Sequence, residues 1–161
     1  MPGWVRELAV VAVAVSLVSM WQTRHHLRGP MPAFSVRSLA GSGFSLADVT
    51  RGKPTLLYVW APWCGVCRAE SQNIGWVRGW LGERANVVSL ATAYESESEV
   101  RTTVAARAPA YPVYLADERA RQALHVDVFP TIYFLDGAGN VKRSVSGYTT
   151  SLGLLWRLLL P

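Results

Sequence analysis

Apolar and polar positions follow two different periods along this chain, and the two periods separate strands from helices. Continuous apolar runs predict buried strands at residues 55–60, 87–90, 113–115 and 131–135. Polar turns and helical spacing of apolar residues predict helices at residues 64–81, 96–107, 118–124 and 152–160. Strands that alternate with helices predict an α/β fold with a central mixed β-sheet flanked by helices.

Shorter signals complete the pattern at both ends of the sheet. A strand is expected to begin at residues 34–36, followed by a glycine-containing hairpin turn at 39–44 and a short capped turn at 45–49. Residues 141–146 are expected to pair with 131–135 around the turn at 136–140. Ser96 and Glu99 have the spacing of a capping box at the start of a helix.

The N-terminal segment differs in character from the rest. Residues 8–21 are apolar apart from two serines, which corresponds to about 21 Å of helix against a hydrocarbon core of about 30 Å. Trp4 and Trp21 bracket this run, as tryptophans at membrane interfaces do. A cleaved signal peptide is the alternative, although the small-x-small site at residues 12–14 lies inside the apolar run.

We therefore expect four segments: an N-terminal flank (1–7), a single transmembrane anchor or uncleaved signal (8–22), a linker (23–32) and one globular domain (33–161).

Charge and composition exclude some classes of partner and fold. The net charge is +5, but the basic residues are scattered and form no run of five, so nucleic acid is not an expected partner. Half of the residues are hydrophobic, enough for a packed core. The two cysteines are too few for a disulfide-stabilised small secreted fold.

Both cysteines lie in one short stretch, which reads Trp60-Ala61-Pro62-Trp63-Cys64-Gly65-Val66-Cys67. Cys64 follows a predicted strand and opens a predicted helix, where unpaired backbone N–H groups and the helix dipole stabilise a thiolate. Cys67 lies one helical turn further on, close enough to form a disulfide with Cys64. A pair that can be both dithiol and disulfide is suited to electron exchange.

Three features make the chain resemble the thioredoxin superfamily. They are the segment from Pro32-Ala33-Phe34 to Gly52-Lys53-Pro54, the Trp-Ala-Pro-Trp-Cys box followed by Glu70, and Phe129-Pro130-Thr131 leading into the strand at 131–135. Within the superfamily, residues 32–160 are similar to the membrane-anchored TlpA/DsbE-like proteins of bacteria and to copper-sensitivity-suppressor-type protein disulfide oxidoreductases. The resemblance implies a thioredoxin-like fold, preceded here by one N-terminal transmembrane helix.

The resemblance also assigns roles around the cysteines. Cys64 is expected to attack, and Cys67, the more buried thiol, to resolve the mixed disulfide. Gly65 and Val66 tune the redox potential, and Trp63 walls the site.

Further along the chain, the resemblance makes Phe129, Pro130 and Thr131 supporting residues. Pro130 is expected to be cis and to lie against the cysteines, with the backbone of Phe129 open to a substrate segment. Glu70 matches an acid of the TlpA-like group that takes a proton from Cys67, although a solvated helix carboxylate fits the sequence equally well. Tyr58 stands where many relatives carry Asp or Asn, which leaves the proton relay open.

The expected function is thiol–disulfide exchange with protein substrates outside the cytoplasm, through a mixed disulfide at Cys64. The resemblance implies a bacterial inner-membrane location with the domain facing the periplasm, a membrane redox partner that recharges the cysteine pair, and no cofactor. Charge counting opposes this orientation, because Arg6 is offset by Glu7 while Arg24 and Arg28 follow the span.

Two other functions compete with thiol–disulfide exchange. One is copper or zinc handling by the two thiolates, although no nearby histidine completes a metal site. The other is thiol peroxidase activity, but neither cysteine stands in a Pro-x-x-x-Thr-x-x-Cys frame.

Overall fold

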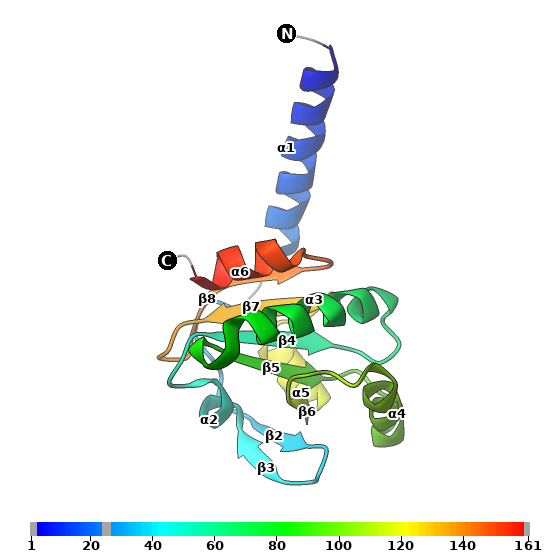
Figure 1. The fold of residues 1–161 in the computed structure, drawn as a ribbon, viewed down its shortest axis with the longest axis vertical. Helices are drawn as coiled ribbons and strands as arrows, with labels where there is room; N and C mark the ends of the chain where they lie inside the picture. Colours follow the sequence, from blue (N-terminus) through cyan, green and yellow to red (C-terminus); the bar gives the residue numbers. More distant parts are fainter. Residues whose placement is uncertain (1–2, 24–26, 160–161) are drawn as a thin grey trace.

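The structure is a computed structural model that describes residues 3–23 and 27–159, without the side chains at positions 12, 15, 16 and 19–23. Residues 1–2, 24–26 and 160–161, which belong to the expected flank, linker and domain end, lie outside the described residues. The remainder forms one mixed sheet with helices on both faces and a separate N-terminal helix (Figure 1).

The sheet contains eight strands in the order β1-β8-β7-β4-β5-β6-β2-β3. Their bounds are β1 (Gly29–Pro30), β2 (Ser35–Ser38), β3 (Gly43–Ser45), β4 (Thr55–Trp60), β5 (Asn86–Ala91), β6 (Val113–Leu115), β7 (Thr131–Leu135) and β8 (Asn140–Ser146). The pairs β4–β5 and β5–β6 are parallel, and every other pair is antiparallel. The predicted mixed sheet is confirmed.

Helices cover the sheet on both sides. They are α2 (Leu46–Thr50), α3 (Gly65–Leu81), α4 (Glu97–Arg107), α5 (Glu118–Ala123) and α6 (Ser151–Leu159), with a 3-10 turn at Gly82–Arg84. The expected turn at 45–49 is the short helix α2, which Ser45 precedes without a side-chain cap. The longer predicted helices agree with the structure to within one residue at each described end.

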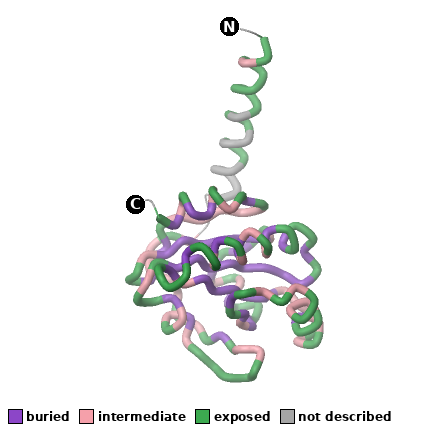
Figure 2. Tube along the Cα trace, in the orientation of Figure 1, coloured by how far each residue is buried: buried purple, intermediate pink, exposed green. Residues whose placement is uncertain are grey.

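The core has two layers because side chains alternate across the central strands. On β4, Leu56, Tyr58 and Trp60 face the cluster formed with α3, α4 and α6. The intervening Leu57 and Val59 face the cluster formed with α2 and α5. All six residues of β4 are buried, as in a strand covered on both faces, and Figure 2 shows buried segments running through the middle of the sheet.

The N-terminal helix α1 (Gly3–Thr23) extends away from the domain, and most of its described side chains are exposed (Figures 1 and 2). We expected residues 8–22 to span a membrane. Within the described residues, however, no helix combines the length and the apolar character needed to cross one.

The end of the expected linker at residues 23–32 lies at the edge of the sheet. Gly29 and Pro30 form β1, which pairs with Val141 and Asn140 at the edge of the sheet. The backbone of Met31 continues this contact by donating a hydrogen bond to the Gly139 carbonyl. Residues 29–31 are therefore hydrogen-bonded to the edge of the sheet.

Candidate functional site

The two cysteines lie where β4 ends and α3 begins. Cys64 is the N-cap residue of α3, and a disulfide joins its sulfur to that of Cys67, with the two Cα atoms 5.2 Å apart. The backbone N–H of Cys67 donates a hydrogen bond to Cys64 Sγ at 3.1 Å. The first turn of α3 thus points a donor at the sulfur that would carry negative charge after reduction.

The two sulfurs differ in their access to solvent. Cys64 is 6% exposed, whereas Cys67 is fully buried. The intervening Gly65 and Val66 are exposed, and so is Trp63, at 64%. Because Val66 and Trp63 are apolar, they form an uncovered apolar rim around the cysteine pair.

A second segment completes this rim. The Phe129–Pro130 peptide bond is cis, as expected. The ring of Phe129 packs edge-on against Trp63, with 5.6 Å between ring centroids, and borders the cluster that contains both cysteines. Thr131 Oγ1 donates a hydrogen bond to the Val128 carbonyl at 2.7 Å and lies 2.9 Å from Ser146 Oγ. These contacts hold the turn before β7 beside the cysteine pair.

Trp63 is held although it is exposed. Its Nε1 donates a hydrogen bond to the Ala93 carbonyl at 2.8 Å. The ring is therefore a fixed part of the rim, because it packs nearly perpendicular to the Phe129 ring and is hydrogen-bonded to the loop after β5. A rigid exposed aromatic surface costs little conformational entropy when a partner binds.

Glu70 is buried below the cysteines. Its side chain is fully shielded from solvent, and Oε2 accepts a hydrogen bond from the Thr149 backbone N–H at 2.9 Å. Oε1 has no hydrogen-bond partner among the described residues. Burial raises the pKa of Glu70 to about 7, against the lowering effect of the Thr149 N–H. The solvated alternative is therefore wrong, because the carboxyl lies on the inner face of α3.

Glu70 and Cys67 share that inner face. They are three positions apart on α3, and side chains at this spacing are neighbours on a helix surface. A carboxyl with a pKa near 7 can both accept and release a proton at neutral pH.

Tyr58 connects β4 to the same helix. Its hydroxyl donates a hydrogen bond to the Cys67 carbonyl at 2.8 Å, and burial raises its pKa far above the usual value. It therefore remains a neutral donor at physiological pH. Tyr58 therefore fixes the backbone of α3 at Cys67.

The sequence analysis missed Arg107, at the end of α4. Its guanidinium lies 5.1 Å from the centroid of the Trp60 ring and donates a hydrogen bond to the Pro62 carbonyl at 3.4 Å. It thus supports the loop that leads into Cys64. No local signal marks this residue, because both contacts are with residues more than forty positions away.

A metal site was one of the alternatives. Over the described part of the chain, no three His, Cys, Asp or Glu side chains gather so that they can hold a metal ion. The two sulfurs are bonded to each other.

Comparison with known proteins places the chain in a sequence family. Residues 27–144 match the AhpC/TSA family. A thioredoxin-like protein of Haemophilus influenzae is 32% identical over 126 residues, which is 77% of this chain and 72% of the relative. The thiol:disulfide interchange protein DsbE of Escherichia coli is 28% identical over 155 residues, which is 86% of this chain and 82% of DsbE.

Solved structures give the same fold. The crystal structure of a putative DsbE from Chlorobium tepidum superimposes with a TM-score of 0.75 at 21% identity, and covers 83% of this chain and 96% of the neighbour. This similarity establishes the thioredoxin-like arrangement of sheet and helices.

Proposed function

The chain belongs to the AhpC/TSA family, and we propose that it is a thioredoxin-like oxidoreductase that exchanges the Cys64–Cys67 disulfide with cysteines of other proteins. The observation that carries the proposal is the disulfide at the N-terminus of α3, with Cys64 nearer the surface. The rim of exposed Trp63 and Val66 and half-buried Phe129 offers an apolar surface to a substrate chain. The names of the matched relatives, thiol:disulfide interchange proteins among them, support the same chemistry.

The exchange proceeds in two steps. In the reduced protein, the Cys64 thiolate attacks a substrate disulfide, which forms a mixed disulfide and releases one substrate thiolate. Cys67 then loses its proton and attacks Cys64 Sγ, which releases the second substrate thiolate and closes the Cys64–Cys67 disulfide. Two electrons pass from the protein to the substrate, and the reverse sequence oxidises a substrate dithiol.

Glu70 is the proposed proton acceptor for Cys67. It is buried on the same face of α3, and its carboxyl is half ionised near pH 7. Gly65 and Val66 separate the sulfurs and set the redox potential through their effect on the Cys64 thiolate. Pro130 and Thr131 hold Phe129 at the rim, where its backbone receives an extended substrate segment.

The proposed location is outside the cytoplasm, with a membrane redox partner that recharges the cysteine pair. The similarity to extracytoplasmic TlpA/DsbE-like proteins supports this location. A reporter enzyme that folds only after disulfide formation, fused to the C-terminus of the full chain in a bacterial host, tests it. Activity of the fusion is expected, and an inactive but intact fusion contradicts the location alone.

Trapping of the mixed disulfide tests the exchange itself. In the full chain, Cys67→Ser removes the resolving sulfur, so incubation with a disulfide-bonded protein is expected to leave an adduct that dithiothreitol reverses. Cys64→Ser and the double variant are the matched controls and are expected to leave none. Non-reducing electrophoresis and mass spectrometry measure the adducts.

Adducts on Cys64→Ser alone would reverse the two roles. If the reduced wild-type chain does not reduce a neutral disulfide such as 2-hydroxyethyl disulfide and the oxidised chain does not oxidise the corresponding thiol, 2-mercaptoethanol, the proposed function is wrong. Rapid consumption of hydrogen peroxide by the reduced chain, without disulfide exchange, would replace it by peroxidase activity.

A further inference from the structure

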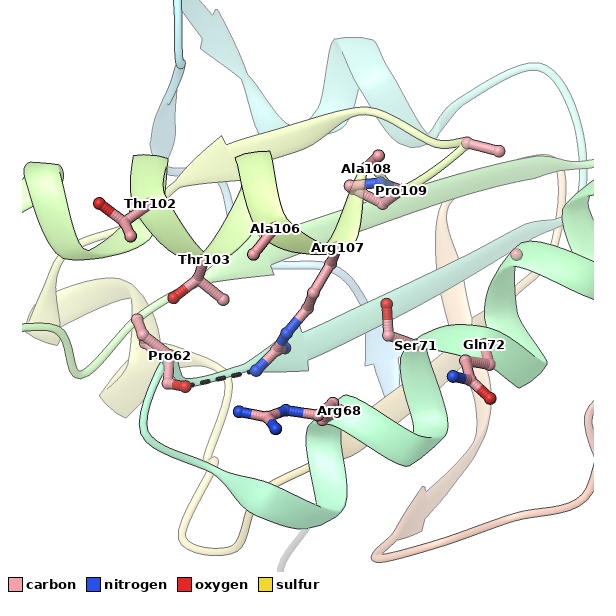
Figure 3. Close-up of a pocket in the computed structure, with 12 residues that line it drawn as sticks. Pro62, Arg68, Ser71, Gln72, Thr102, Thr103, Ala106, Arg107, Ala108 and Pro109 are labelled. Atoms are coloured by element: carbon pink, nitrogen blue, oxygen red, sulfur yellow. Dashed lines mark hydrogen bonds between the residues drawn. The ribbon is translucent and has the colours of Figure 1, made fainter.

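A pocket of about 720 Å³ lies beside the cysteine pair, between α3 and α4. Arg68, Ser71 and Gln72 line it from α3, and Thr103 and Arg107 line it from α4 (Figure 3). It also reaches Pro62, in the loop before Cys64. Pro62 and Arg68 flank the cysteine segment in the sequence, although neither cysteine lines the pocket.

The lining is positively charged. It contains two arginines, Arg68 and Arg107, and no Asp or Glu side chain. Neither guanidinium forms an ion pair within the described part of the chain.

The two arginine side chains differ in how firmly other residues hold them. Arg107 is fixed by the Pro62 carbonyl and the Trp60 ring. Arg68 is exposed and makes no hydrogen bond or ion pair to other described residues, and Figure 3 shows it near the Pro62–Arg107 contact. Burial lowers the pKa of Arg107, and the charge of Arg68 acts in the same direction. The two cations therefore repel each other across the pocket, and an anion between them would relieve the repulsion.

We propose that this pocket, which we call the arginine pocket (Arg68, Arg107 and the α3 and α4 residues around them), binds an acidic segment of the protein whose cysteines exchange with Cys64. The inference rests on the proposed function and deepens it, because it assigns a charge to the partner. Guanidinium groups bind carboxylates through paired N–H donors. The hydroxyl group of Thr103 adds a short-range donor on the wall formed by α4.

The size and position of the arginine pocket favour a protein segment. A volume of several hundred Å³ accommodates more than one side chain. A chain held at the Trp63–Phe129 rim by its reacting cysteine passes the first turn of α3, where Arg68 stands. Charge complementarity at this distance from the reacting sulfur acts mainly on the rate of encounter and on the choice of partner.

The test uses the full-length reduced protein and two peptides. Each carries one cysteine in a disulfide with 2-mercaptoethanol. The residues on both sides of the cysteine are Asp and Glu in one peptide, and Asn and Gln in the other. We measure the second-order rate constant for each peptide and take the acidic-to-amide ratio, in which changes to the cysteine chemistry common to both peptides cancel.

The wild type is expected to favour the acidic peptide by about three- to tenfold at low salt, with the preference falling at high salt. Arg68→Gln is expected to bring the ratio to about that of free dithiothreitol, and Arg68→Glu to lower it further. Arg119→Gln, on the exposed face of α5, removes the same charge far from the pocket and is expected to keep the wild-type ratio.

A wild-type ratio equal to that of dithiothreitol would overturn the arginine pocket as a docking site. The same drop in Arg68→Gln and Arg119→Gln would overturn it too, because it would assign the preference to net charge. Reaction with the amide peptide is scored separately. If the wild type reacts neither with the amide peptide nor with 2-hydroxyethyl disulfide, the proposed disulfide exchange is wrong. This outcome differs from a lost acidic-to-amide preference, which concerns the arginine pocket alone.

Discussion

Glu70 illustrates how much one residue depends on its surroundings. A carboxyl on a helix is usually solvated, and burial of a charged one without compensation is costly. In this protein one backbone N–H, that of Thr149, faces Oε2, and Oε1 lacks a partner among the described residues. Burial favours the protonated form and outweighs the Thr149 N–H, which favours the charged one, so the pKa of Glu70 rises to about 7.

Glu70→Gln is predicted to become more stabilising as pH rises. Below pH 4.5 the carboxyl is protonated in both the folded and the unfolded chain. Between pH 4.5 and 7 it ionises in the unfolded chain alone, so the wild type loses stability and the glutamine variant does not. The free energy of unfolding of Glu70→Gln, relative to wild type, is expected to rise by about 1–2 kcal/mol from pH 4 to pH 8 after allowance for solvent screening.

Urea unfolding of the oxidised full chain at several pH values measures this difference. Glu83→Gln, which changes an exposed carboxyl after α3, is the control for loss of a surface charge. A relative stability of Glu70→Gln that is independent of pH would contradict the raised pKa.

At the scale of the elements, the hydrogen bonds at the start of α4 stabilise the helix that carries Arg107. Ser96 caps α4, because its Oγ accepts a hydrogen bond from the Glu99 backbone N–H at 3.3 Å. The reciprocal bond of the predicted capping box is displaced by one residue, since the Glu99 carboxylate accepts from the Glu95 backbone N–H. The cap matters for the site because Arg107, at the other end of α4, supports the loop before Cys64.

Ser96→Ala is predicted to lower the free energy of unfolding by about 1 kcal/mol, the usual contribution of an N-cap hydroxyl. Ser98→Ala, on the first turn of the same helix, removes an exposed hydroxyl that does not cap a backbone N–H. It is expected to change stability by less than about 0.5 kcal/mol. Urea denaturation followed by circular dichroism compares them, and equal losses would mean that the cap does not stabilise α4.

Most central elements could be predicted from the sequence because their own residues determine them. The apolar runs of β4 and β7 indicate strands that are buried on both faces, and the spacing of Ile74, Val77 and Leu81 indicates the inner face of α3. The cysteine pair is equally local, since its helix and its strand adjoin it. The local sequence pattern was sufficient to predict an element wherever contacts between residues close in sequence determine it.

The rest depends on contacts between distant residues. Gly29 and Pro30 have no strand period and pair only because β8 offers an open edge. The burial of Glu70 requires the backbone at Thr149, and the place of Arg107 requires Trp60. None of these partners lies within forty positions, so no pattern within a helix or strand could predict them.

At the scale of the whole molecule, α1 stands apart from both cores. Among the side chains that the structure describes, neither cluster of buried residues includes one before Val36, and Leu27 is the first to pack against them. The domain therefore carries its own core and its own site, as an independent folding unit does.

A chain that begins at residue 27 is predicted to unfold within about 1 kcal/mol of the full chain and to exchange disulfides at the same rate. Urea denaturation and reduction of 2-hydroxyethyl disulfide measure both properties side by side. A loss of more than about 2 kcal/mol would mean that α1 contributes to the fold through its contacts with β8.

The order of the strands also has a consequence for biosynthesis. The middle strand β4 pairs with β7 through residues as distant in sequence as Thr55 and Leu135. A ribosome therefore releases Cys64 and Cys67 well before it has made Phe129, Pro130 and the strand that follows. During that interval the two thiols lack the neighbouring segment around Phe129 and Pro130. The nascent chain thus first meets cellular oxidants and reductants with an unprotected pair of thiols. The substrate selectivity of the folded protein arises only after its last third has been translated.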